Sequence, residues 1–159
     1  MRLFFSVLVL FSFSMINAQE SDEQKVKNTI DAFFNGFHKQ DSIAIRATVS
    51  SAIRMQTIGK NKVGSDSVRS VAFGNFLRAI VQIPDSVHFE ERLMGYSIQV
   101  DGSMSHAWTP YEFWFNDTFS HCGVNSFQLF KEDQTWKILS ILDTRRKEDC
   151  YNESSGKQD

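Results

Sequence analysis

The feature that most limits what this chain can fold into is a run of three long alternating segments near its C-terminal end. Apolar and polar side chains alternate, with many aromatic residues, through residues 104–115, 118–130 and 135–145. A period of two is typical of β-strands that bury one face. Asn116-Asp117 and residues 131–134 supply turns between the segments, and Asp101-Gly102 is a strong hairpin signal before them. The pattern predicts an antiparallel meander whose long strands must twist and curve.

The residues before this meander have a mainly helical pattern. Ser21 and Gln24 form a capping box, and the apolar residues that follow recur at helical spacing, which predicts a helix over residues 22–38. Asp41 is expected to cap a second, short helix. A third helix is expected over residues 68–82, because apolar residues again follow helical spacing there.

Two more strands are expected between these helices and the meander. One covers residues 52–58, and a longer one runs from Val87 to Val100 with an irregularity near Gly95. We interpret Glu90-Glu91-Arg92 within it as a solvated charge run. Helices interspersed with strands and followed by a meander predict the α+β class, with the helices on one face of the sheet. A curved sheet with helices on its concave side encloses a pocket.

Composition and the N-terminal pattern predict one globular domain preceded by an export signal. The chain has 159 residues, a net charge of -2 and fifteen Phe, which suits one domain with a sizeable apolar core and gives no basic excess for nucleic acid. Arg2, the apolar run at residues 3–13 and Ala18 predict a signal peptide over residues 1–18; the alternative is an uncleaved anchor. We therefore expect a periplasmic or secreted protein that is not held in a membrane after cleavage, with a domain at 19–146 and a polar tail at 147–159.

The two cysteines, Cys122 and Cys150, leave two possibilities open. An oxidising compartment permits a disulfide between them, which requires the tail to fold back onto the sheet. The alternative is two separate thiols, of which Cys122 is the more buried. Their spacing matches no zinc motif, and we expect neither a metal nor a cofactor.

Several short motifs resemble the nuclear transport factor 2-like superfamily over residues 23–146. They are the Phe-rich first helix, the break at Lys39-Gln40-Asp41 and the strand Trp136-Lys137-Ile138. Three further motifs look like those of small exported bacterial members: Tyr111-Glu112-Phe113, His121-Cys122-Gly123-Val124 and Asp143-Thr144-Arg145-Arg146. The resemblance implies a cone-shaped α+β barrel, in which a strongly curved antiparallel sheet wraps around three N-terminal helices. It also implies an internal pocket at the wide end and frequent dimerisation through the sheet.

That superfamily includes ketosteroid isomerase, scytalone dehydratase and polyketide cyclases, together with transport, dimerisation and ligand-binding modules. The fold alone therefore does not select a function.

The last two predicted strands hold the chemically most informative side chains. If a five-residue turn joins Phe130 to Trp136, Gly123 lies opposite Asp143 and His121 lies opposite Arg145. Alternation then places six side chains on one face of the sheet: His121, Gly123, Asn125, Ile141, Asp143 and Arg145. A register different by one residue would separate them.

This face predicts a site. A His121-Asp143 pair can act as general acid and base, because a nearby carboxylate orients an imidazole and raises its basicity. Arg145 is expected to hold a carboxylate or phosphate of a ligand through its planar guanidinium group. The other expected ligand contacts are Tyr111, Asn125 and Phe113.

Each of these residues also has a structural explanation. Asp143 is equally compatible with an ion pair to Arg145 or Arg146 at the end of the sheet. His121 is compatible with a buried hydrogen bond, and Tyr111 and Phe113 with packing of the core.

Three functions remain open at this stage. The first is a module that binds a small, partly apolar ligand in a conical pocket. The second is a cofactor-free lyase, isomerase or cyclase that uses the His121-Asp143 pair. The third is a non-catalytic interaction module. The expected partners are a small-molecule ligand and a second copy of the chain in a homodimer.

Overall fold

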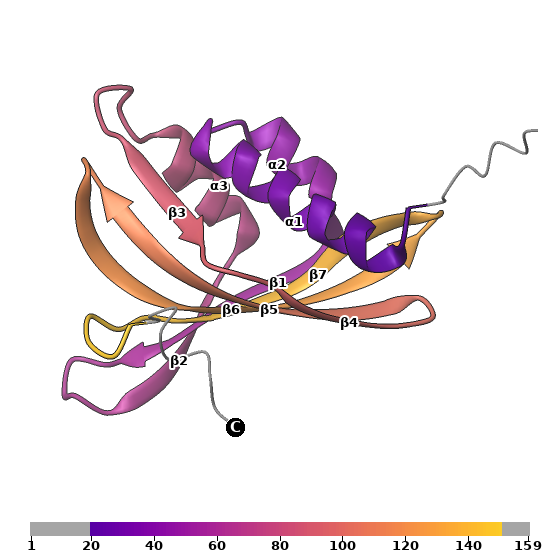
Figure 1. The fold of residues 1–159 in the computed structure, drawn as a ribbon. Helices are drawn as coiled ribbons and strands as arrows, with labels where there is room; N and C mark the ends of the chain where they lie inside the picture. The colour runs from indigo at the N-terminus through magenta and orange to yellow at the C-terminus, as the bar shows by residue number, and fades with distance from the viewer. Residues whose placement is uncertain (1–19, 151–159) are drawn as a thin grey trace, which may run out of the picture.

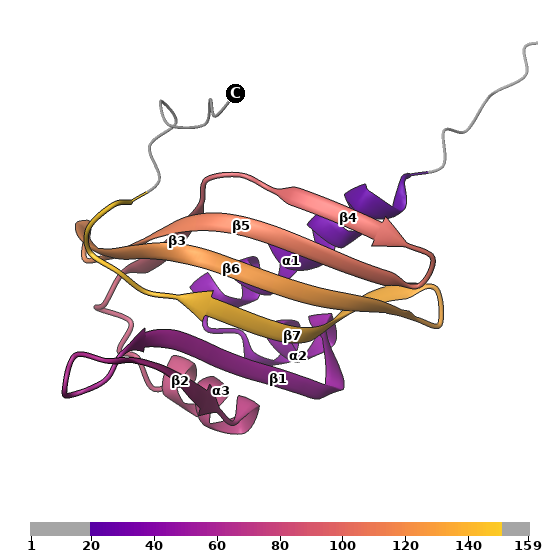
Figure 2. The ribbon, with the colours of Figure 1, turned by 90° about the horizontal axis from the view of Figure 1, so that it is seen from below.

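In the computed structural model, which describes residues 20–150, three helices lie across one face of a curved seven-stranded sheet (Figure 1). Figure 2 shows the opposite face, over which no helix of the described residues lies. The predicted α+β architecture, a cone formed by a curved sheet with the helices on its concave side, is confirmed. The sheet is open rather than closed into a complete barrel.

The elements follow one another in a mixed order of helices and strands. They are α1 (Asp22–His38), α2 (Ser42–Thr48), β1 (Val49–Lys60), β2 (Asp66–Val71), α3 (Phe73–Val81), β3 (Phe89–Leu93), β4 (Ser97–Asp101), β5 (Met104–Phe115), β6 (Thr118–Glu132) and β7 (Thr135–Thr144).

The first two helices begin where the sequence predicts. The Ser21 hydroxyl accepts a hydrogen bond from the backbone N–H of Gln24 at 3.2 Å, and α1 then covers residues 22–38 as expected. One Asp41 carboxylate oxygen accepts from the N–H groups of Ile43 and Ala44, both at 3.0 Å, and so begins α2. These caps satisfy backbone donors that have no partner within the helix.

The predicted third helix over residues 68–82 is wrong in its first part. Residues Asp66–Val71 form β2, which pairs antiparallel with β1, and α3 begins only at Phe73. The Asn61 side chain, which accepts from the N–H groups of Val63 and Ser65, stabilises the turn that allows this pairing. Val68 is 58% exposed, so it does not belong to the apolar stripe of the helix. The spacing of the apolar residues Val68 and Val71 is compatible with a helix and with a strand, and pairing with β1 selects the strand.

The sheet has the strand order β2-β1-β7-β6-β5-β3, with β4 also pairing with β5. All pairs are antiparallel except β1 with β7, which is parallel, so the expected purely antiparallel sheet is wrong in this one pair. Parallel neighbours need a long connection. Here β2, α3 and the strands β3 to β6 lie between β1 and β7 and supply it.

The register of the last hairpin differs from the predicted one. The predicted opposition of Gly123 to Asp143 is wrong, because Asn125 lies opposite Asp143. The turn is a two-residue one at Asp133-Gln134, both with positive φ, and a bulge follows between Gln128 and Leu129. Together they move the pairing by two residues. Beyond the bulge the shift is even, so the side chains of residues 121–128 and 140–145 stay on their predicted faces.

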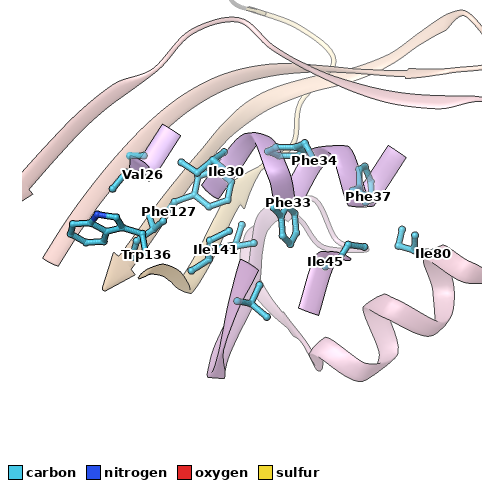
Figure 3. Close-up of a cluster of buried hydrophobic side chains, with 14 of the residues drawn as sticks. Val26, Ile30, Phe33, Phe34, Phe37, Ile45, Ile80, Phe127, Trp136 and Ile141 are labelled. Carbon is cyan, nitrogen blue, oxygen red and sulfur yellow. The ribbon is translucent and has the colours of Figure 1, made fainter. Parts of the chain in front are cut away.

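The core lies between α1 and the concave face of the sheet. Figure 3 shows the apolar face of α1, including Ile30 and Phe33, gathered with Phe127, Trp136 and Ile141 from the strands. Phe127 is fully buried, and Phe34 meets its ring edge-on with centroids 6.1 Å apart. The helix layer and the sheet therefore hold each other through aromatic packing.

The C-terminal end of the described chain is attached to β6. Cys122, fully buried in β6, forms a disulfide with Cys150, and their Cα atoms are 5.7 Å apart. The backbones of Cys122 and Arg146 exchange two hydrogen bonds of 2.9 Å each. Of the two possibilities left open by the sequence, the structure has the disulfide, and the segment after β7 folds back as that requires.

The predicted signal peptide lies outside the described residues, as does the end of the predicted tail. Among the helices in residues 20–150, none has the length and apolar composition needed to cross a membrane.

Candidate functional site

A cavity of about 280 Å³ lies between the helices and the concave face of the sheet. Its walls are mostly apolar: Phe33, Phe34, Phe37, Met55, Phe76, Ile80, Phe113, Phe127 and Ile141. Phe76 of α3 stacks against Phe33 and Phe37 of α1, with ring centroids 6.2 Å and 5.9 Å apart. These stacked rings form an aromatic helical wall that packs α3 against α1.

One part of the cavity wall is polar, and we call it the polar end. It consists of Glu91, His121, Asn125, Asp143 and Arg145. The predicted face of the last hairpin is therefore correct, because His121, Asn125, Asp143 and Arg145 all line one cavity. These side chains converge although they come from three strands and the segment after β7.

Asp143 is held by three hydrogen-bond donors. The Thr57 hydroxyl donates to one carboxylate oxygen at 2.5 Å. The other oxygen accepts from Arg145 Nε at 2.9 Å and from the Tyr111 hydroxyl at 3.5 Å. Both oxygens are thus engaged within the protein, so this carboxylate is fixed and not free to bind a ligand.

Glu91 has a different environment. Its Oε1 accepts a hydrogen bond of 2.7 Å from the Asn125 side chain, and the described residues contribute no bond to its Oε2. Burial raises the pKa of Glu91 to about 7, and the negative charge of Asp143 acts in the same direction. The Asn125 hydrogen bond and the charge of Arg145 oppose this rise without cancelling it. Glu91 therefore changes its protonation state near neutral pH.

His121 lines the cavity but does not form the predicted pair with Asp143. Its Nδ1 lies 3.1 Å from the Ser120 hydroxyl, and its ring stacks on Phe113 with centroids 5.0 Å apart. Burial and the charge of Arg145 lower the pKa of His121 despite the nearby Asp143 carboxylate. The expected gain in basicity is therefore absent, and the imidazole is mainly neutral at pH 7.

Arg145 lies at the mouth of the cavity, with its side chain 54% exposed. Within its guanidinium group only Nε hydrogen-bonds to the described protein, by donating to Asp143. Its terminal amino groups have no hydrogen-bond partner within residues 20–150. A guanidinium group fixed by one carboxylate can still present these donors to a second anion.

Gly123 allows the chain to place Arg145 there. A Cβ atom at this position would lie 1.8 Å from the carbonyl oxygen of Thr144. That same oxygen accepts a hydrogen bond of 2.9 Å from the Tyr111 hydroxyl. The close crossing of the segment after β7 over β6 is possible only without a side chain on Gly123.

Of the predicted ligand contacts, Asn125, Phe113 and Arg145 line the cavity, whereas Tyr111 is not part of its lining. Tyr111 is 1% exposed and supports Asp143 and Thr144 from behind the wall. Burial raises its pKa above the ordinary value, so its hydroxyl stays protonated. The assignment of catalytic roles to His121 and Asp143 stays a prediction.

The sequence interpretation missed two residues of the site. Glu91 is not part of a solvated charge run, because it lies between Phe89 and Leu93 on the inner face of β3. Strand alternation places residues two apart on the same face, so the flanking apolar pair was a usable signal. The second is Thr57 on β1, whose hydroxyl donates to Asp143. Nothing in the local sequence indicates that β1 pairs parallel with β7.

Chemically, the polar end can hold and move a proton at Glu91 and can present hydrogen-bond donors from Arg145 and Asn125. No group of three or more His, Cys, Asp or Glu side chains suited to a metal ion occurs in the part of the chain that the structure describes.

Solved structures with the same arrangement of helices and sheet identify the fold. An NTF2-like protein of unknown function from Pseudomonas putida matches 85% of this chain and 91% of its own, with a TM-score of 0.63 and 12% identity. The chain has the nuclear transport factor 2-like fold. The fold predicted from the short sequence motifs is thus confirmed.

Other proteins with the NTF2-like fold differ in their assigned activities. A candidate dehydratase of the NTF2-like family from Streptomyces avermitilis matches 79% of this chain and 96% of its own (TM-score 0.60, 14% identity). A candidate ketosteroid isomerase from Shewanella frigidimarina matches 75% of this chain and 94% of its own (TM-score 0.55, 10% identity). No protein-family model matches the chain, and no curated protein matches it in sequence. At these identities the NTF2-like fold is shared, and function must be argued from the site.

Proposed function

We propose that this protein binds a small, mostly apolar molecule in the cavity between its helices and its sheet. The observation that supports the proposal most directly is the cavity itself, with aromatic walls and one polar end. Concave, largely apolar sites with a few convergent polar groups are the usual form of small-molecule sites.

The volume limits the size of the ligand. A cavity of about 280 Å³ is larger than the roughly 150 Å³ that holds benzene in an engineered core. It lies just below the range of about 300–1,000 Å³ that is typical for drug-sized ligands. We therefore expect a compound with one or two rings, with its rings against Phe33 and Phe113 and its polar group toward Asn125.

Binding of the neutral compounds benzamide and 2-naphthamide, followed by ligand-observed NMR and calorimetry, tests the proposal. A Met55→Trp variant should abolish binding, because the indole fills the cavity from β1. Arg54→Trp is the matched control, since Arg54 is exposed on the opposite face of the same strand. Absence of binding in wild type, or equal binding by the Met55→Trp variant, would contradict the proposal.

Proton transfer to a bound ligand is a second candidate function. The observation that favours it is Glu91, a carboxyl group in the cavity wall whose pKa is near 7. A general base works best when its pKa is close to the working pH. In this alternative the Glu91 carboxylate removes a proton from carbon next to a carbonyl and returns it to the resulting enolate.

Deuterium exchange at the α-carbons of 2-tetralone in D₂O, observed by NMR, separates this candidate from simple binding. Catalysis predicts exchange above the buffer rate in wild type and loss of that excess in Glu91→Gln. His121→Ala tests the predicted His121-Asp143 pair in the same way. An exchange rate equal to that of buffer alone, at concentrations where 2-tetralone binds, rejects this candidate.

We also propose that the protein functions outside the cytoplasm. The Cys122–Cys150 disulfide supports this, because disulfides persist in oxidising compartments. Fusing residues 1–20 to an alkaline phosphatase that lacks its own leader tests export. Phosphatase activity in intact cells is expected, whereas an inactive cytoplasmic fusion would contradict the proposal.

A further inference from the structure

We propose that the cavity selects a small apolar carboxylate, held between Arg145 and Glu91, and that Glu91 takes up a proton when this ligand binds. This inference rests on the ligand-binding function proposed above and adds the chemical class of the ligand and its coupling to pH.

Apart from Glu91 Oε2, the hydrogen-bonding groups that the described residues leave free at the polar end are mainly donors. Both Asp143 oxygens are engaged by Thr57, Arg145 and Tyr111. The terminal amino groups of Arg145 make no bond within residues 20–150, and Asn125 orients Glu91 by donating to its Oε1. A ligand group rich in acceptors, such as a carboxylate, satisfies these donors best.

Charge explains why Glu91 must be protonated in the complex. Asp143 and Arg145 neutralise each other through their ion pair. With Glu91 ionised, a carboxylate ligand would add a third negative charge beside a single positive one. With Glu91 protonated, its Oε2–H becomes one more donor to the ligand. Like charges a few ångströms apart in a partly buried site favour protonation of one of them.

The surroundings of Glu91 on every packed element agree with this assignment. The titratable groups around it are Asp143 on β7, Arg145 after β7, His121 on β6, Tyr111 on β5 and His38 on α1. His38 Nε2 accepts a hydrogen bond of 3.0 Å from the backbone N–H of Glu91 and is therefore unprotonated there. Burial lowers the pKa of both His38 and His121. Near pH 7 Arg145 is therefore the principal positive charge among these groups, and Glu91 is the group that titrates.

An amine ligand is the main alternative. The ammonium group of an amine donates hydrogen bonds, so it would need the ionised Glu91 carboxylate as an acceptor. An amine would therefore bind more tightly as the pH rises and Glu91 loses its proton. Arg145 at the mouth opposes a cation and leaves its own free donors unused, so we expect amines to be excluded.

The experiment compares three ligands that share one ring system: 2-naphthoate, 2-naphthamide and 2-naphthylmethylamine. Calorimetry from about pH 6 to pH 8.5, in two buffers of different ionisation enthalpy, gives the affinity and the number of protons taken up. Naphthoate should bind most tightly at pH 6, and its affinity should fall about tenfold per pH unit above pH 7, because the binding-competent fraction falls by that factor. Proton uptake should approach one per ligand at the upper end of the range.

Variants assign the effect to residues. Arg145→Gln should weaken naphthoate about tenfold or more, as expected for a charged hydrogen-bonded pair, without weakening naphthamide. Glu91→Gln keeps a donor at this position and should bind naphthoate independently of pH. Arg54→Gln on the outer face is the matched control and should behave as wild type. If Glu91→Gln does not fold, proton uptake by wild type and the Arg145→Gln comparison still decide the question.

The outcomes are distinct. Naphthamide binding with no preference for naphthoate, or naphthoate binding without proton uptake, overturns this inference and leaves the proposed function intact. Tightest binding of the amine, strengthening with pH, also overturns it. If none of the three compounds binds, the proposed function fails as well.

Discussion

Gly123 is the residue whose replacement should be least tolerated at the site. A Cβ there would lie 1.8 Å from the Thr144 carbonyl oxygen and 2.8 Å from a Tyr111 ring carbon, so backbone must move. We expect Gly123→Ala to lower the free energy of unfolding by about 3 kcal/mol, as severe overpacking does. Thermal or urea denaturation measures the change.

Gly95 provides the control for that substitution. A Cβ at Gly95 has no atom within 4 Å, so Gly95→Ala should change stability by less than about 1 kcal/mol. Equal effects of the two substitutions would show that the crossing of Thr144 over Gly123 is not tight.

Glu91 makes a separate prediction about stability and pH. Burial raises its pKa from 4.5 to about 7, so between these values the unfolded chain has released a proton that the folded chain still holds. The stabilisation from this group is complete below about pH 4.5 and is lost as the pH rises toward 7, by about 2 kcal/mol after allowance for partial exposure. Glu91→Gln should lack this loss and be more stable than wild type at pH 8.

Urea denaturation between about pH 4 and pH 8 tests this sign. Glu112→Gln on the outer face of β5 is the matched control and should follow the wild-type curve. A wild-type stability that rises relative to Glu91→Gln across this range would contradict a raised pKa for Glu91.

At the scale of elements, the disulfide between β6 and the segment after β7 matters most. It joins two cysteines that are 28 residues apart in the sequence. Replacing both Cys122 and Cys150 by alanine should cost about 2–4 kcal/mol, mainly because the unfolded chain gains freedom. It should also weaken the binding of 2-naphthoate more than that of 2-naphthamide, since Arg145 lies in the segment that the disulfide holds. In reducing buffer the stability of the wild-type protein should approach that of the double variant. Peptide mapping without reduction should recover the two cysteine peptides linked to each other.

At the scale of the whole molecule, stability should decrease from the centre of the sheet to its β2 edge. β6 lies between β5 and β7 and contains the fully buried Phe127 and Cys122. β2 pairs only with β1 and is mostly exposed. Amide hydrogen exchange should therefore be slowest in β6 and fastest in β2, because edge elements open locally at lower cost. Comparable protection of both strands would contradict this gradient. The expected homodimer through the sheet stays a prediction, which sedimentation can test.

Several features of the fold were predictable from local sequence alone. Ser21 and Asp41 begin helices through hydrogen bonds made within three residues, and the period of the apolar residues distinguishes α1 from the long strands. These are short-range effects, so a single segment contains the information. The even shift in the last hairpin also preserved the predicted face of His121, Asn125, Asp143 and Arg145.

Other features depended on partners distant in sequence. The strand β2 exists because it pairs with β1, and Thr57 reaches Asp143 because β1 runs parallel to β7. The local pattern determined α1, α2, the three long strands of the meander and the inward-facing side chains of the last hairpin. Only the tertiary structure decided that the half-buried Glu91 lies beside Asp143 and Arg145, because desolvation and charge proximity arise when separate strands converge. The proton on Glu91, on which the proposed chemistry of the cavity depends, is therefore a property of the assembled sheet and not of any segment within it.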